Sequence, residues 1–269
     1  MDTRRKLRSC IGGWIWGATT DARFQVKDVQ TCNPSSDNSH QFLTLHAYTS
    51  PPLHPRMMSP TLVRRIIKPA VFIACLLPLL WLVARAFEIG GGLGANPVEK
   101  IQDTLGQWGL RFLVITLAIT PLRDWLNAPW LVMLRRMLGL FAFAYVLLHF
   151  LTWLLLDQGL FWSGILADIA KRPFITIGFT ALVLLIPLAI TSTNKMMRRL
   201  GKRWKKLHRL MYPISLLAVW HYYWQVKADV REPLIYASIV AVLLGWRLWK
   251  TRRASTRAAS QSAALARDA

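Results

Sequence analysis

Six blocks of apolar residues dominate this chain from residue 66 onward. They span about residues 66–87, 108–122, 137–156, 174–192, 209–226 and 233–249. A bilayer core of about 30 Å takes roughly 20 apolar residues in a helix, and a helix satisfies its own backbone polar groups where no water is present. The pattern therefore predicts an all-α, polytopic membrane protein, a bundle of six transmembrane helices. The second block is short, and Arg111 is expected near one end of it, reaching the interface.

Lys and Arg residues predict the orientation of these helices. One side of the membrane receives Arg64, Arg65, Lys68, Arg123, Arg135, Arg136, the run from Lys195 to Arg209, and the tail from Lys250. The other side receives only Lys100, Lys171, Arg172, Lys227 and Arg231. The richer side is expected to be cytoplasmic, which places both termini there and runs the third and fifth helices outward. The net charge of +21 is explained by this topology better than by nucleic-acid binding.

The first 56 residues differ in composition from the rest. They are polar, rich in Ser, Thr, Asn and Pro, and show no sustained helical or strand period, so little fixed structure is expected there. Met57 and Met58 directly precede the first basic-then-apolar segment, which favours an upstream extension or a start assigned too early over a cytoplasmic tail. The predicted organisation is an N-terminal extension (1–56), a membrane domain (57–250) and a cytoplasmic tail (251–269).

Two histidines stand inside apolar blocks at matching depth. His149 lies 13 residues after Arg136, and His221 lies 12 after Arg209, so both are roughly 18–20 Å from the cytoplasmic edge. Ionisable side chains at such depth are costly and usually functional. Neutral imidazole is a strong iron ligand, which makes the pair candidate axial ligands of a haem between helices 3 and 5, nearer the outer leaflet. The alternative is two histidines hydrogen-bonded within the bundle or relaying protons.

His208 is a third candidate, on the basic edge before the fifth block. As an iron ligand it would hold a second haem about 20 Å nearer the cytoplasm. On an ideal helix, however, it points about 220° away from His221, unless Pro213 distorts the turn between them. Met137, a non-protein ligand and lipid phosphate all remain open as its partner.

Other motifs narrow the choice of function. No GxGxxG follows a strand and no Walker A sequence occurs, so electrons must come from another molecule. The three cysteines form no CxxC pair, which gives no sign of a disulfide framework or a metal–thiolate site. The basic run from Lys195 to Arg209 is expected to contact anionic headgroups, the alternative being a phosphate site for a flavin or for haem propionates.

Several motifs resemble one known family. They are GGLGANPV (91–98), ITPL (119–122), RRMLGL (135–140) followed by His149, KRPFITIG (171–178), TST (191–193), RRLGKRWKKLH (198–208), HYYWQVK (221–227) and EPLIYA (232–237). Over about residues 60–250 the chain is similar to MsrQ (YedZ), the haem-binding membrane subunits of the bacterial periplasmic methionine sulfoxide reductase system, relatives of ferric reductase transmembrane domains.

The resemblance implies a six-span haem b protein of the bacterial inner membrane that also binds FMN. It would take electrons from the quinone pool and pass them to a periplasmic molybdopterin-containing catalytic subunit that repairs oxidised proteins, and would perform no sulfoxide chemistry itself. His149, His208 and His221 match the family's haem-linked histidines. The competing functions are a ferric-reductase-like oxidoreductase, a histidine-dependent transporter or proton channel, and a structural anchor.

Overall fold

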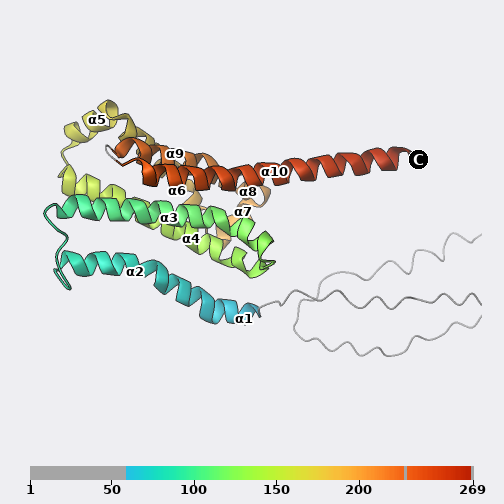
Figure 1. Ribbon diagram of the computed structural model, residues 1–269, viewed down its shortest axis with the longest axis horizontal. Helices are drawn as coiled ribbons and strands as arrows, with labels where there is room; N and C mark the ends of the chain where they lie inside the picture. Colours follow the sequence, from blue (N-terminus) through green and yellow to red (C-terminus); the bar gives the residue numbers. More distant parts are fainter. Residues whose placement is uncertain (1–58, 227–228, 268–269) are drawn as a thin grey trace, which may run out of the picture. The chain divides into compact units, whose positions relative to one another are not determined.

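The computed structural model describes residues 59–226 and 229–267, which belong to one unit of the chain, Pro52–Ala269. The predictions for residues 1–56 and for Lys227 lie outside this range. Every regular element in the described part is helical (Figure 1). The protein is therefore an all-α membrane protein, as predicted. Five of its helices are long and apolar enough to cross a bilayer.

The first two long helices match the first two blocks only in part. A short helix, α1 (Pro60–Leu62), and a π-helical turn (Val63–Ile67) lead into α2 (Lys68–Ala86). Helix α3 (Pro97–Trp125) is 29 residues long, so the expected short second span is wrong. It begins eleven residues before the apolar block, because Pro97 occupies its first turn and the following turns are polar.

Arg111 is consequently in the middle of α3 and not near its end. Its Nε donates to the hydroxyl of Tyr236 at 3.1 Å, and its guanidinium lies over the ring of Trp108, 4.8 Å from the ring centre. The expectation that Arg111 is near the end of its helix is therefore wrong, and its position relative to the membrane interface stays a prediction. The side chain instead links α3 to α10, where a phenol and an aromatic face stabilise its charge.

The remaining blocks also become helices. The third apolar block forms α4 (Val132–Thr152), which a 3₁₀ turn (Pro129–Leu131) precedes and a π-helical turn (Trp153–Asp157) follows. A short connecting helix, α5 (Trp162–Lys171), precedes α6 (Pro173–Ile190), and α7 (Asn194–Leu200) and α8 (Lys202–Leu207) follow. A 3₁₀ turn (His208–Leu210) leads into α9 (Met211–Gln225), and α10 (Arg231–Arg267) continues through the predicted tail. Helix α9 corresponds to the fifth predicted span, but with only 15 residues it is not among the five helices counted above, so the count of six stays a prediction.

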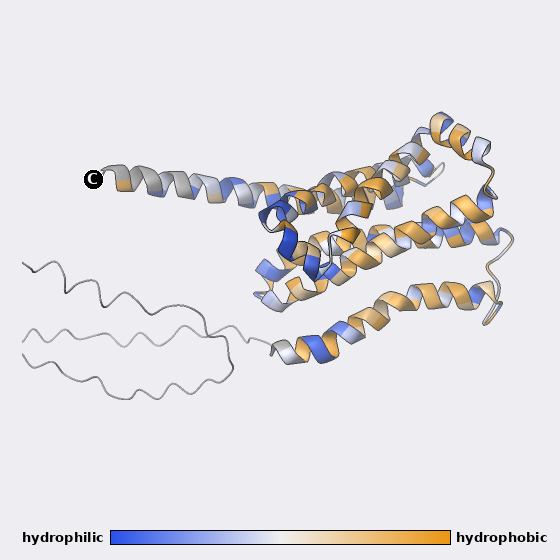
Figure 2. Cartoon of the chain, turned by 180° about the vertical axis from the view of Figure 1, so that it is seen from behind, coloured by the Kyte–Doolittle hydropathy of each residue, from blue (hydrophilic) through white to orange (hydrophobic). Residues whose placement is uncertain are grey.

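Packing within this unit is organised in helix pairs. Helix α4 packs along α3, α9 packs along α6, and α4 also contacts α6. Helix α10 packs against α9 and α3, whereas α2 contacts α3 and α4 more sparsely. Apolar residues cover the long helices and polar residues gather on α7 and α8 (Figure 2). The four helices α3, α4, α6 and α9 therefore form the core that positions the candidate site.

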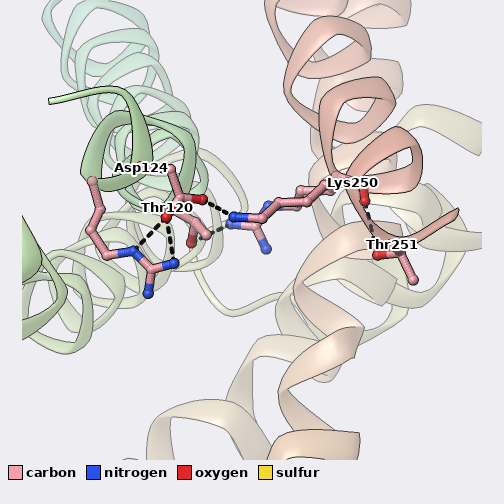
Figure 3. Close-up of polar contacts among 6 residues, drawn as sticks. Thr120, Asp124, Lys250 and Thr251 are labelled. Atoms are coloured by element: carbon pink, nitrogen blue, oxygen red, sulfur yellow. Dashed lines mark hydrogen bonds and ion pairs between the residues drawn. The ribbon is translucent and has the colours of Figure 1, made fainter. Parts of the chain in front are cut away.

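Further polar contacts connect the outer helices α2 and α10 to this core. The Tyr145 hydroxyl donates to the carbonyl of Cys75 at 2.8 Å and accepts from the amide of Leu79 at 3.1 Å, inserting into the hydrogen-bond ladder of α2 beside Pro78. At the C-terminal end of α3, Asp124 pairs with Lys250 of α10 (Figure 3).

Arg247 also links α10 to the core helices. Its guanidinium donates to the Leu117 carbonyl and the Thr120 hydroxyl, both at 2.9 Å, and to the Tyr212 hydroxyl at 2.6 Å. Charged hydrogen bonds of this kind fix the register of α10 against α3 and α9.

Candidate functional site

His149 and His221 face each other across the helix core. His149 lies near the end of α4 and His221 near the end of α9, and both side chains are partly buried. Their ring centres are 6.2 Å apart and the ring planes meet at 75°. The structure thus brings together the two histidines that sequence analysis singled out by depth.

Each imidazole is held by one backbone carbonyl. The Nδ1 of His149 lies 2.9 Å from the oxygen of Gln102 on α3, and the Nδ1 of His221 lies 2.7 Å from the oxygen of Phe174 on α6. A carbonyl oxygen only accepts, so both bonds require the hydrogen to be on Nδ1. Each neutral ring therefore keeps an Nε2 lone pair available for a metal.

The two rings line a cavity of about 630 Å³. Its deep wall is apolar and comes from all four core helices, with Leu113, Val146, Leu182 and Ile214 among its residues. At one end polar groups line it: Glu99, Asp103, Asp157, Arg172, Asp229 and Glu232. A volume in the range of cofactor pockets, roughly 300–1,000 Å³, with an apolar wall and a polar end suits a large, flat, amphipathic molecule.

The spacing of the rings fits one iron atom between them. A metal–imidazole bond is about 2 Å long, and the nitrogen lies about 1.15 Å from the ring centre, which puts the centres of two opposed ligands roughly 6.3 Å apart. The observed separation is 6.2 Å. No group of three or more His, Cys, Asp or Glu side chains in the described residues is arranged to hold a metal. Two imidazoles alone make an incomplete set for a bare ion, whereas a porphyrin brings four nitrogens of its own.

His208 is placed away from these two histidines. It begins the 3₁₀ turn before α9, is half-buried, and is not among the residues that line the cavity. Its ring stacks on Trp204 with centres 3.9 Å apart, and its Nδ1 lies 3.1 Å from the Trp204 oxygen. Burial lowers the pKa of His208, and the positive charge of Arg135 lowers this pKa further. The ring is therefore neutral near pH 7, and a ligand role for it stays a prediction.

Met137 and the basic segment complete the sequence-predicted groups. Met137 is partly buried against the apolar core. The segment from Lys195 to Arg209 forms α7, α8 and the following turn, with most of its Lys and Arg side chains exposed. Arg136 contacts Asn194 at the start of α7. This exposed, basic surface suits anionic headgroups or phosphates.

Sequence reasoning missed the groups that hold the two imidazoles. Backbone carbonyls have no residue signature, and the glycines next to them, Gly106 and Gly178, carry no side chain that could indicate a role. The available signal is a regular spacing, because each histidine follows its carbonyl residue by 47 positions.

Comparisons with known proteins identify relatives of this chain. Residues 105–219 match a family model described as ferric reductase like transmembrane component. Proteins named protein-methionine-sulfoxide reductase heme-binding subunit MsrQ are similar over most of their length. The one from Xanthomonas oryzae pv. oryzae is 50% identical over 202 residues, 74% of this chain and 93% of the relative.

Two further relatives carry the same name. The protein from Xanthomonas campestris pv. campestris is 51% identical over 200 residues, which is 73% of this chain and 92% of the relative. The protein from Rhodospirillum rubrum is 55% identical over 194 residues, which is 71% of this chain and 92% of the relative. Identity at this level over nearly whole relatives, together with the helix core described above, shows that the chain belongs to the MsrQ family.

Proposed function

We propose that this chain is the haem-binding, electron-transferring membrane subunit of a methionine sulfoxide reductase system. The observation that carries the proposal is the pair of imidazoles, on α4 and α9, whose centres lie 6.2 Å apart. The names of the relatives support it, since they describe heme-binding subunits. A bound haem b would supply a one-electron carrier inside an apolar bundle.

The chain's own residues would hold and orient that group. His149 and His221 would each present Nε2, while the bonds from Nδ1 to the carbonyls of Gln102 and Phe174 fix the ring rotation and raise the basicity of the free nitrogen. The apolar wall from α3, α4, α6 and α9 would exclude water. Neither histidine needs to titrate for this role.

The orientation of the chain in the membrane, and with it the side on which electrons would leave, is inferred from the distribution of Lys and Arg residues. The basic segment α7–α8 and the basic residues of α10 favour a cytoplasmic location for these segments. Glu232, at the polar end of the cavity, is at the opposite end of α10. We therefore assign the chain to the bacterial inner membrane with both termini cytoplasmic. The haem would lie nearer the periplasm, where a docked partner can accept electrons.

The donor, the acceptor and a second cofactor rest on the family resemblance. We propose the quinone pool as donor and a periplasmic, molybdopterin-containing catalytic subunit as acceptor, with the repair of oxidised methionine carried out by that partner. We also propose FMN as an additional cofactor. The exposed basic residues of α7–α8 would offer charged donors to its phosphate. His208 remains the candidate ligand of a second haem or a participant in donor oxidation.

A reduced-minus-oxidised optical spectrum of the purified full-length chain tests the proposal. We expect a b-type α band, with haem and flavin quantified on the same sample. A featureless spectrum would contradict haem binding and would favour a transporter in which His149 and His221 titrate. Flavin release at a fixed ratio to protein would support the FMN assignment, and its absence from haem-loaded protein would contradict it.

A further inference from the structure

The site is built twice, by two helix pairs related by a constant step along the chain. His149 and His221 are 72 residues apart, and so are their carbonyl partners Gln102 and Phe174. The same step relates α3 to α6 and α4 to α9. The packed pair α3–α4 therefore corresponds to the packed pair α6–α9. The step also relates the tripeptides that begin at Thr104 and Thr176, TLG and TIG. Each half of the site thus consists of one carbonyl, one glycine and one histidine.

The glycine of each half lies directly against the imidazole. A Cβ atom added at Gly106 would lie 3.1 Å from both Nδ1 and Cε1 of His149. At Gly178 the corresponding distance to Nδ1 and Cε1 of His221 is 2.8 Å. Both values are shorter than ordinary van der Waals contact, which lies between 3.4 and 4 Å. The space that a Cβ would take is therefore occupied by the ring in each half.

Helix geometry explains why this space has to be free. Gly106 follows Gln102 by four residues, and Gly178 follows Phe174 by four. In an α-helix the carbonyl of residue i points at the amide of residue i+4, and the side chain at i+4 stands beside it. Without that side chain, the second lone pair of the carbonyl is open to another donor. A glycine at this position lets an imidazole lie on the helix backbone and donate to the carbonyl.

We propose that Gly106 and Gly178 are positioning residues that set the rotation of the two imidazoles. The inference rests on the proposed haem function and deepens it. Each glycine leaves room for the Nδ1–carbonyl bond, and that bond turns Nε2 toward the iron position. A methyl group at either glycine pushes the edge of the imidazole ring away from the helix. The hydrogen bond from Nδ1 to the carbonyl then lengthens, and Nε2 no longer points at the iron position.

The two glycines differ in how far an added methyl group would displace the neighbouring imidazole ring. At Gly178 the 2.8 Å contact forces a shift, whereas the 3.1 Å contact at Gly106 requires His149 to give by a few tenths of an ångström. Both contacts are with a ring held by a hydrogen bond and not with the end of a flexible chain. We expect Gly178→Ala to weaken haem binding about 10- to 100-fold, as loss of a group behind a metal ligand typically does. Gly106→Ala should show a smaller loss.

The test compares both variants with other glycine-to-alanine changes in the same bundle. Gly139→Ala, whose new methyl would meet only Thr116 at 3.7 Å, and Gly245→Ala, with nothing within 4 Å, are the silent controls. Gly164→Ala is the packing control, because its Cβ would meet the Phe161 side chain at 2.9 Å and Gly164 is not among the residues that line the cavity. Haem-to-protein ratio, spin state of the oxidised haem and midpoint potential are measured for each, with and without free imidazole.

We expect part of the haem in Gly178→Ala to become high-spin and to return to low-spin when imidazole is added, because the missing ligand is then replaced. A smaller high-spin fraction or a shifted potential is expected for Gly106→Ala, and the parent's spectrum for Gly139→Ala and Gly245→Ala. Gly164→Ala should keep low-spin haem even where its stability falls. If the Gly178→Ala protein does not accumulate in cells, the spin state and midpoint potential of Gly106→Ala test the positioning role.

The positioning role is overturned if Gly106→Ala and Gly178→Ala keep the parent's spectrum, haem content and potential. It is also overturned if Gly164→Ala reproduces their high-spin fraction, since helix packing alone then explains the effect. A parent protein without low-spin haem contradicts the proposed function itself, which separates the two failures.

Discussion

Each of the two facing imidazoles has its Nδ1 bonded to a backbone carbonyl, and within residues 59–226 and 229–267 its Nε2 has no hydrogen-bond partner. This arrangement suits metal binding better than proton transfer, because a relay needs both nitrogens to exchange partners, and here Nδ1 of His149 and of His221 is bonded to a group that cannot donate. The carbonyls of α3 and α6 thus determine which nitrogen of each ring forms the hydrogen bond and which remains available for a metal.

Replacing either histidine tests this at the level of single residues. We expect His149→Ala or His221→Ala to remove most of the haem absorbance from purified protein, because one axial bond and one hydrogen bond are lost together. The absorbance at the Soret and α bands, relative to protein, measures it. Full retention of haem in either variant would refute the assigned pair.

His208 calls for a separate measurement, because it is outside the cavity and stacked on Trp204. We expect His208→Ala to lose a second haem component or the oxidation of quinol, while the haem held by His149 and His221 remains. The haem-to-protein ratio and the rate of haem reduction by a quinol analogue measure the two effects. An unchanged ratio with normal turnover would leave His208 a structural residue of the α8–α9 turn.

At the scale of elements, the helices differ in how they are attached. Helices α3 and α4 pack along one another, whereas α2 contacts them more sparsely, and the Tyr145 hydroxyl inserted between Cys75 and Leu79 adds a polar link to the apolar contacts of α2. Tyr145 is only 2% exposed, and its hydroxyl both donates and accepts a hydrogen bond. Such a bridge favours one position of α2.

We expect Tyr145→Phe to lower stability while leaving haem content unchanged. Hydrogen bonds between membrane helices contribute about 0.6 kcal/mol on average and at most about 1.7 kcal/mol, so a loss in this range is predicted. The free energy of unfolding in detergent measures it. Tyr223→Phe is the matched control, since Tyr223 is 44% exposed on α9. Equal stabilities of the two variants would show that the bridge contributes nothing.

Sequence patterns predicted some of these elements better than others. Blocks that are apolar all round stand out by hydropathy, which is why α2, α4 and α6 were located closely. The start of α3 was missed because its first turns carry Gln102, Asp103 and Gln107, which line the cavity instead of facing lipid. A matching depth could be predicted for His149 and His221 from their distance to Arg136 and Arg209. Their carbonyl partners could not, since any residue type supplies one.

At the scale of the whole molecule, charge and helix number together determine orientation. With α9 counted as a crossing, the chain crosses six times and both ends of the membrane domain share one side. The basic segment α7–α8 and the basic part of α10 would then lie in the cytoplasm, opposite the carboxylates at the cavity end.

Reporter fusions test this topology. Green fluorescent protein fused after Ala269 should fluoresce and alkaline phosphatase at the same place should be inactive, because both expectations follow from a cytoplasmic C-terminus. Fusions after Gln158, which follows α4, should give the reverse. Active phosphatase at Ala269 would contradict the even number of crossings or the orientation.

The most direct test of the central claim is low-temperature electron paramagnetic resonance of the purified, oxidised protein. Two imidazoles on one iron give a low-spin ferric signal, and planes that meet at 75° predict the strong anisotropy of near-perpendicular ligands. We predict this signal in the parent and its loss in both His149→Ala and His221→Ala. A parent protein that is high-spin, or the same low-spin signal persisting in both variants, would contradict a haem held between α4 and α9.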